Sequence, residues 1–170
     1  LVGMKPVVVH GGGPDISSFL KKLNIESKFI NGLRVTNAET MEVAEMVLSG
    51  KINKQIVTDI ELNGVKAVGI SGKDGDTVKA KKIEKDGIDC GFVGNIESVD
   101  PALVKTLIDN DIIPVIAPIG MDEKGQSYNI NADYMAVAIA GSLKAEKLVF
   151  LTDVAGVLKD VNDPSSIMSF

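Results

Sequence analysis

The chain contains few of the residues that carry nucleophilic, redox and metal chemistry in many proteins. Its 170 residues include one cysteine and one histidine. Because Cys90 is alone, no internal disulfide can form, which favours a reducing compartment and a cytoplasmic location. One histidine and one cysteine are also too few for a metal site built from these ligands. His10 lies in no motif that supplies a matching nucleophile, so we interpret it as a structural residue.

Excess positive charge and long apolar runs are also lacking. The net charge of −5 argues against a broad surface for nucleic acid or anionic membrane. The aliphatic stretch 112–120 is too short to cross a bilayer, and the basic, apolar start of a secretory signal is missing. A hydrophobic content of 45% is, however, enough to bury one sizeable core. We therefore expect one domain over residues 1–170 that binds neither nucleic acid nor membrane.

Strand-like and helix-like patterns alternate along the chain. The β-branched run from Pro6 to His10 stops at three glycines, and apolar residues then recur at helical spacing up to Leu23. The segment Thr36 to Glu39 has the form of a capping box and predicts a second helix that Gly50 ends. Further strands are expected at 65–70, 112–117 and 148–152, further helices at 52–63, 101–108 and 135–143, and an exposed hairpin within 71–89. These repeated units indicate an α/β fold, a three-layer sandwich with a mainly parallel central sheet and helices on both faces.

Ligands of parallel sheets bind beyond the carboxyl ends of the strands, and the glycine turn 11–13 lies at that edge. Glycines let the backbone approach an anion closely, and the first N–H groups of the next helix add partial positive charge. Gly12 and Gly13 are the better donors. The alternative is that a strand-to-helix crossover needs glycine only to turn, and a short glycine motif does not decide between the two.

Three more segments at this edge carry polar side chains. Arg34 stands just before an expected helix start, where its planar guanidinium either binds a carboxylate bidentately or forms an ordinary surface salt bridge. The segment Asn129–Asp133 has polar side chains at its first, third and fifth positions. A helix cap explains Asn131 or Asp133, but it does not explain all three polar residues. The segment 152–157 either offers a hydroxyl, a carboxylate and open backbone to a nucleotide or is an ordinary turn. The Gly-Lys pair at 72–73 lacks the glycine spacing of a P-loop and is set aside.

Taken in order, these motifs resemble the amino-acid kinase family, and within it the N-acetylglutamate kinases. The Asn-Gly-Leu-Arg-Val-Thr string at 31–36 is the most discriminating, because carbamate, aspartate and nucleoside-monophosphate kinases share the other signatures more readily. The resemblance covers nearly the whole chain and rests on Val7–Pro14, Asn31–Thr36, Ser71–Gly75, Ile113–Pro118, Tyr128–Asp133 and Leu151–Val154.

The resemblance implies transfer of the ATP γ-phosphoryl group to the side-chain carboxylate of N-acetyl-L-glutamate, a step of arginine biosynthesis. It places Gly12 and Gly13 at the carboxylate and phosphoryl oxygens that react. It assigns the α-carboxylate of the substrate to Arg34 and the substrate backbone to Asn129. Asp133 is the expected catalytic residue, because it would orient catalytic lysines.

For the nucleotide side, the resemblance implies that Thr152, Asp153 and Gly156 lie beside ATP, whose phosphates Mg²⁺ bridges. A homo-oligomer is expected for the full-length protein, while regulation by arginine or by a PII-type signalling protein stays open.

The chain departs from the family pattern at both ends. A complete member is expected to begin with a strand carrying Lys-x-Gly-Gly and to continue to a second lysine, and both lysines would neutralise charge on the transferring phosphoryl group. We therefore expect an incomplete domain that lacks its N-terminal strand and its C-terminal nucleotide side, and a 170-residue chain that is inactive by itself. The alternatives are a non-catalytic module for acetylglutamate or a protein partner, and a kinase for another small carboxylate or carbamate.

Overall fold

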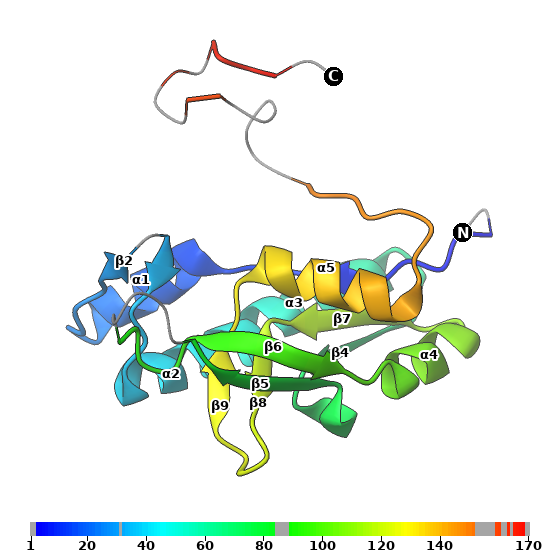
Figure 1. Ribbon diagram of the computed structural model, residues 1–170. Coiled ribbons are helices and arrows are strands. Elements are labelled where there is room, and N and C mark those ends of the chain that lie inside the picture. The colour runs from blue at the N-terminus through cyan, green and yellow to red at the C-terminus, as the bar shows by residue number, and fades with distance from the viewer. Residues whose placement is uncertain are drawn as a thin grey trace.

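The central element of the fold is a parallel sheet of three strands in the order β1–β7–β4 (Figure 1). The structure, a computed structural model, describes residues 3–30, 32–83, 89–151, 159–160, 163 and 165–168. In the sheet, β7 (Ile113–Ala117) pairs with β1 (Val8–Val9) on one side and with β4 (Ala67–Ser71) on the other. All three strands run in the same direction, so the predicted parallel sheet is confirmed.

Helices cover both faces of this sheet. On one face, α3 (Asn53–Leu62) packs against Val115 of β7 through an apolar stripe that includes Ile56. On the other face, α4 (Ala102–Asp109) and α5 (Ala132–Leu143) pack against Ile116, the next residue of the same strand. Because successive strand residues point to opposite faces, the near-continuous apolar run of β7 is buried on both sides. The predicted three-layer arrangement is confirmed.

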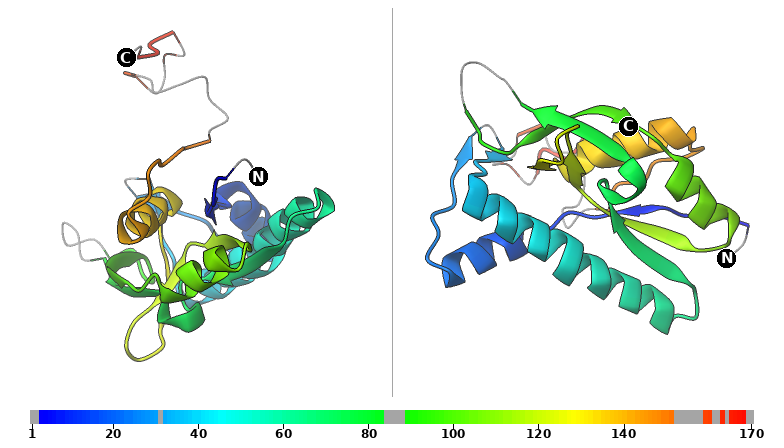
Figure 2. Two further views of the ribbon diagram at one scale, coloured as in Figure 1. Left: turned by 90° about the vertical axis from the view of Figure 1, so that its right-hand side faces the viewer. Right: turned by 90° about the horizontal axis from the view of Figure 1, so that it is seen from below.

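The glycine turn leads from β1 directly into α1 (Gly13–Lys22), as predicted, with Pro14 in the first turn. The next helices, α2 (Ala38–Glu45), η1 (Met46–Ile52) and α3, form one continuous rod (Figure 2). The predicted helix end at Gly50 is therefore wrong: this glycine lies inside the π-helical η1 and has no left-handed φ that would cap a helix.

The start of α2 also differs from the predicted capping box. The N-cap is Asn37, whose Oδ1 accepts a hydrogen bond from the backbone N–H of Thr40 at 2.8 Å. The hydroxyl of Thr36 instead donates to the carbonyl oxygen of Arg34 at 2.7 Å. Since Asn and Thr are both good N-cap residues, the sequence pattern could not tell these neighbours apart.

A second sheet of four strands lies beside the first, in the order β6–β5–β8–β9. The antiparallel pair β5 (Val78–Lys82) and β6 (Gly94–Val99) corrects the predicted hairpin, which was placed within 71–89 and in fact extends to Val99. The other hairpin of this sheet is formed by β8 (Ile119–Met121) and β9 (Ser127–Asn129). The smaller elements are β2 (Phe29–Ile30), β3 (Leu33–Arg34) and the 3-10 turn η2 (Asp74–Asp76).

The strand predicted at 148–152 is absent from its described part, Leu148–Leu151. These four apolar side chains are between 42% and 95% exposed, and none of them pairs with a described strand. An apolar run forms a stable strand only beside a partner strand, and here the chain leaves α5 and runs away from the sheet (Figure 1). Thr152 lies outside the described residues. None of the described helices is long and apolar enough to cross a membrane.

Candidate active site

A cavity of about 180 Å³ opens at the carboxyl end of β1, beside the start of α1. Four of the predicted site residues, Gly12, Gly13, Arg34 and Asn129, line it together. They come from the glycine turn, from β3 and from β9, which are far apart in the sequence. The structure therefore brings the predicted substrate side of the site together in one place.

The glycine turn contains backbone N–H groups that have no acceptor among the described residues. Gly11, Gly12 and Gly13 carry these N–H groups, and all three residues line the cavity. None of the three has a left-handed φ. A methyl group added at Gly11 would lie 3.7 Å from Ala132 Cβ, and one added at Gly13 would lie 3.9 Å from Arg34 Nη2, both ordinary contacts. At these two positions the fold does not require glycine, which favours close approach of an anion over the crossover alternative.

Gly12 is different, because the fold leaves no room for a side chain there. A Cβ at Gly12 would clash with Ile52 Cδ1 and would lie 2.8 Å from Leu48 Cδ2. Both side chains belong to the π-helical η1, and Leu48 is fully buried. Close packing against the helical rod therefore explains the glycine at this position.

Arg34 is buried, with 6% of its surface exposed, and its guanidinium ties the turn to its surroundings. Its Nη2 donates to the carbonyl oxygen of Gly13 at 2.8 Å and to Ser17 Oγ at 2.9 Å, and its Nη1 donates to Ser27 Oγ at 2.5 Å. The guanidinium also lies over the ring of Phe29, 4.5 Å from the ring centroid. Burial lowers the pKa of Arg34, yet a guanidinium stays protonated in proteins. A cation is thus held at the cavity wall next to the free N–H groups.

Asn129 also lines the cavity, and the buried hydroxyl of Thr36 links it to Arg34 of β3. Its Nδ2 donates to Thr36 Oγ1 at 3.4 Å, and Thr36 is fully buried. The backbone N–H of Asn129 donates to the carbonyl oxygen of Phe92 at 2.9 Å. Sequence reasoning did not select Thr36 as a site residue, although a polar residue between an arginine and a helix start is a detectable signal.

Asp133 is not among the residues that line the cavity. It is exposed in the first turn of α5, and its carboxylate bonds to no described residue. The helix cap is Asn131, whose Oδ1 accepts from the N–H groups of Asp133 at 2.9 Å and Tyr134 at 3.1 Å. This settles which of the two residues is the cap. The predicted nucleotide contacts Thr152, Asp153 and Gly156 lie outside the described residues.

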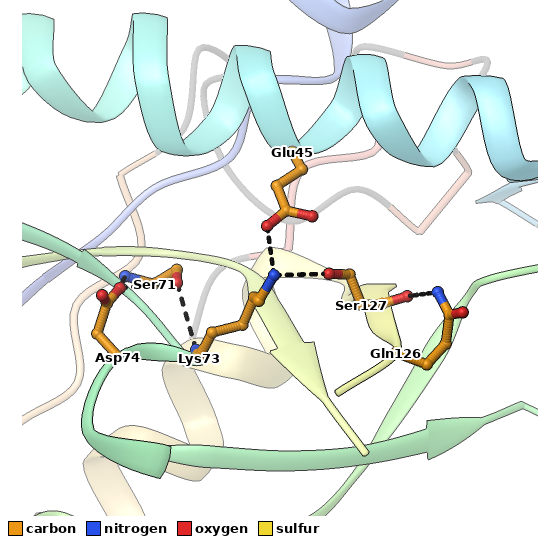
Figure 3. Close-up of polar contacts among 6 residues, drawn as sticks. All are labelled: Glu45, Ser71, Lys73, Asp74, Gln126 and Ser127. Carbon is orange, nitrogen blue, oxygen red and sulfur yellow. Dashed lines mark hydrogen bonds and ion pairs between the residues drawn. The ribbon is translucent and has the colours of Figure 1, made fainter. Parts of the chain in front are cut away.

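Lys73, which the sequence did not place in any site, links its own loop to α2 and to β9 (Figure 3). Its Nζ donates to Glu45 Oε1 of α2 at 2.7 Å and to Ser127 Oγ of β9 at 2.9 Å. The loop that carries Lys73 is fixed by Asp74, whose Oδ2 accepts from the N–H and the hydroxyl of Ser71. Because β9 also carries Asn129, this ion pair anchors one wall of the cavity to the helical rod.

The described residues fit the oxygen-rich part of a phosphate or carboxylate ligand better than a metal ion. Free N–H groups and a guanidinium are donors, which suit anionic oxygens. No group of three or more His, Cys, Asp or Glu side chains that could hold a metal occurs within the part of the chain that the structure describes.

Known proteins resemble this chain in sequence and in fold. Residues 1–167 match the model of the amino acid kinase family. An acetylglutamate kinase from Moorella thermoacetica is 54% identical over 99% of this chain and 60% of its own length. One from Caldanaerobacter subterraneus is 58% identical over 99% of this chain and 56% of its own length. The chain thus spans a little over half the length of these curated relatives.

Two solved structures share the architecture. The protein smu.665 from Streptococcus mutans superposes with a TM-score of 0.86 and 33% identity, over 92% of this chain and 63% of its own. N-acetylglutamate synthase from Neisseria gonorrhoeae, complexed with coenzyme A and N-acetyl-glutamate, superposes with a TM-score of 0.80 and 26% identity, over 92% and 36%. With the family model matched over almost its whole length, the chain belongs to the amino acid kinase family.

Proposed function

We propose that the protein is an acetylglutamate kinase, which transfers the γ-phosphoryl group of ATP to the side-chain carboxylate of N-acetyl-L-glutamate in arginine biosynthesis. The observation that carries this proposal is the convergence of Gly12, Gly13, Arg34 and Asn129 on one cavity. The names of the curated relatives support the choice of substrate, since they are acetylglutamate kinases over the length they share with this chain. A cytoplasmic location belongs to the same proposal.

Each group has a role that its chemistry suits. The buried guanidinium of Arg34 pairs with the α-carboxylate, while Asn129 hydrogen-bonds the amide backbone of the substrate. The N–H groups of Gly12 and Gly13 face the side-chain carboxylate and the phosphoryl oxygens, where negative charge must be held during transfer.

The chemical step requires no base. An ionised carboxylate oxygen attacks the γ-phosphorus, the bond from that phosphorus to the β,γ-bridging oxygen breaks, and its electron pair leaves with ADP. The product is an acyl phosphate, and no proton moves, which accords with a site that has no catalytic histidine or cysteine. When bound to the nucleotide phosphates, Mg²⁺ supplies charge neutralisation.

The remaining roles are further parts of the proposal. Asp133 orients the two catalytic lysines that the family resemblance places outside these 170 residues, and Thr152, Asp153 and Gly156 contact the nucleotide. The chain spans 56–60% of the relatives named above. We infer that the 170 residues alone do not catalyse phosphoryl transfer, and that a protein with the full length of these relatives does.

One assay tests the proposal. ADP release and acyl-phosphate trapping by hydroxylamine are measured for the complete gene product with acetylglutamate, glutamate, aspartate and carbamate as acceptors. We expect acetylglutamate to exceed the others in kcat/KM by at least about a hundredfold, because a buried site rejects acceptors that leave its polar groups unpaired. Faster reaction with carbamate or aspartate would assign another kinase of the family, and binding of acetylglutamate without turnover would assign a non-catalytic module.

A further inference from the structure

His10, the only histidine, lies immediately before the glycine turn and is buried, with 7% of its surface exposed. Its Nδ1 lies 2.9 Å from the carbonyl oxygen of Gly11. A carbonyl oxygen can only accept a hydrogen bond, so Nδ1 must carry the proton and donate it. The other ring nitrogen, Nε2, is then an acceptor in the neutral ring.

The partner of Nε2 is Asn53, the first residue of α3, which is fully buried. Its Nδ2 lies 3.2 Å from His10 Nε2 and donates to the carbonyl oxygen of Val115 at 2.9 Å. Turning the amide over would set Asn53 Oδ1 against that carbonyl oxygen, two acceptors facing each other. The amide orientation and the His10 tautomer therefore support each other.

The fold makes special room for Asn53. A Cβ at Gly69 of β4 would clash with Asn53 Oδ1, so the amide lies directly on the sheet where a glycine leaves space. The same Oδ1 accepts from Lys54 Nζ at 3.0 Å. In sequence, Asn53 occupies an apolar stripe position with Ile56 and Ile60, a signal that sequence reasoning missed.

The π-helical segment η1 explains how one helix can contact two successive residues of the turn. A π-helix places residue i+5 over residue i, so Leu48 and Asn53 come to the same side of the rod. Leu48 packs behind Gly12, and Asn53 bonds to His10. In an uninterrupted α-helix these two residues would point in clearly different directions.

These contacts fix where the turn's N–H groups point. In a planar trans peptide, the C=O and the following N–H point in opposite directions. His10 holds the Gly11 carbonyl, which turns the N–H of Gly12 away from the His10 ring, whose other nitrogen contacts Asn53 of the helical rod. The Gly12 carbonyl accepts from the N–H of Ile16 at 3.0 Å, which likewise turns the N–H of Gly13 away from α1.

We propose that His10 and Asn53 are positioning residues, which hold the Gly11 peptide so that the Gly12 N–H faces the cavity as an anion donor. This inference rests on the proposed function for its catalytic consequence, but the geometry itself is testable without substrate. It gives His10 a specific task beyond the structural role that the sequence suggested.

Two matched variants test the proposal. In His10→Asn, the side-chain amide N–H can replace Nδ1–H as donor to Gly11, whereas His10→Leu fills a similar volume without a donor. NMR of the unliganded chain should show the Nδ1–H tautomer of His10. The Gly11–Gly13 amides should be rigid in the wild type and in His10→Asn, and mobile in His10→Leu.

Kinetics of the complete gene product provide the second readout. We expect His10→Leu to lower kcat for acetylglutamate phosphorylation at least about tenfold with a smaller change in KM, because the donor acts most in the transition state. His10→Asn should restore kcat. Val104→Ala, in the core on the opposite face of the sheet, is the control for destabilisation alone and should leave kcat unchanged.

The outcomes separate the two proposals. An Nε2–H tautomer in the wild type would overturn the positioning role even if neither variant folds. A rigid turn in a folded His10→Leu variant would overturn it as well. A wild-type protein that does not phosphorylate acetylglutamate would overturn the proposed function instead, and the NMR result would still decide the role of His10 and Asn53.

Discussion

At the scale of one residue, a substitution at Gly13 should change ligand affinity without lowering stability, because the protein has room for a methyl group there. The added Cβ of Gly13→Ala would lie 3.9 Å from Arg34 Nη2, on the wall of the cavity. Alanine is the better helix former at the start of α1, so we expect an unchanged or higher melting temperature. Affinity for acetylglutamate should fall about tenfold or more, equal to about 1.4 kcal/mol, because the methyl group occupies the space of the anion. Calorimetric titration and thermal unfolding measure both.

Gly12→Ala is the informative contrast to Gly13→Ala. Its Cβ would clash with Ile52 and crowd Leu48, so this variant should lose stability and affinity together. If Gly13→Ala also lost stability in proportion to affinity, the glycine turn would be explained by chain reversal, which is the alternative that the sequence left open.

At the scale of elements, the sequence predicted the helices and strands that have a regular apolar pattern. It missed the features that depend on packing between elements distant in sequence. The strand β7 and the helix α3 could be predicted from the sequence. Burial on both faces of a strand gives a continuous apolar run, and burial of one side of a helix gives apolar residues at helical spacing. The continuation of the helix through Gly50 and the failure of 148–151 to form a strand depend on tertiary packing, which no local pattern encodes. Likewise, Gly12, Arg34 and Asn129 were found by motif, whereas Asn53 and Lys73 gain their roles only from contacts with distant elements.

Gly50 tests the continuity of the helical rod. It is exposed within η1, and nothing lies within 4 Å of an added Cβ. Gly50→Ala should therefore raise the free energy of unfolding by about 0.5–1 kcal/mol, because alanine reduces the conformational entropy of the unfolded chain. Urea denaturation measures the change. A helix that ended at Gly50 in a left-handed cap would be destabilised by the same substitution, so a loss would restore the sequence-based helix end.

The Lys73 ion pair should contribute more to the stability of β9 than an exposed ion pair contributes to the strand that carries it. Lys73→Met leaves Glu45 and Ser127 without their shared donor and should cost about 1 kcal/mol of unfolding free energy. The matched control is Lys81→Met, whose partner Glu97 is on the neighbouring strand and whose side chain is 61% exposed, with an expected cost of about 0.5 kcal/mol or less. Urea denaturation compares the two, and amide exchange at Ser127 and Asn129 should accelerate only in Lys73→Met. Equal effects of both variants would remove the anchoring role of Lys73.

At the scale of the whole molecule, His10 should make stability depend on pH. Burial lowers the pKa of His10 below its ordinary value of 6.5, partly offset by the hydrogen bond to Gly11. As pH falls below 6.5, the unfolded chain therefore takes up a proton that the folded protein does not yet bind, and stability declines. The decline ends once the pH lies below the folded-state pKa, and its slope is at most about 1.4 kcal/mol per pH unit.

Because His10 is the only histidine, its substitution isolates this effect. The difference in unfolding free energy between the wild type and His10→Asn should be constant above pH 7 and should shrink from pH 6.5 downward. Carboxylates titrate mostly below this window and contribute to both proteins alike, so they cancel in the difference. Denaturation curves at half-unit intervals between pH 5 and 8 measure it. Parallel curves over that range would mean that His10 is as easily protonated in the folded protein as in the unfolded chain. That result would contradict the lowered pKa that burial gives to His10.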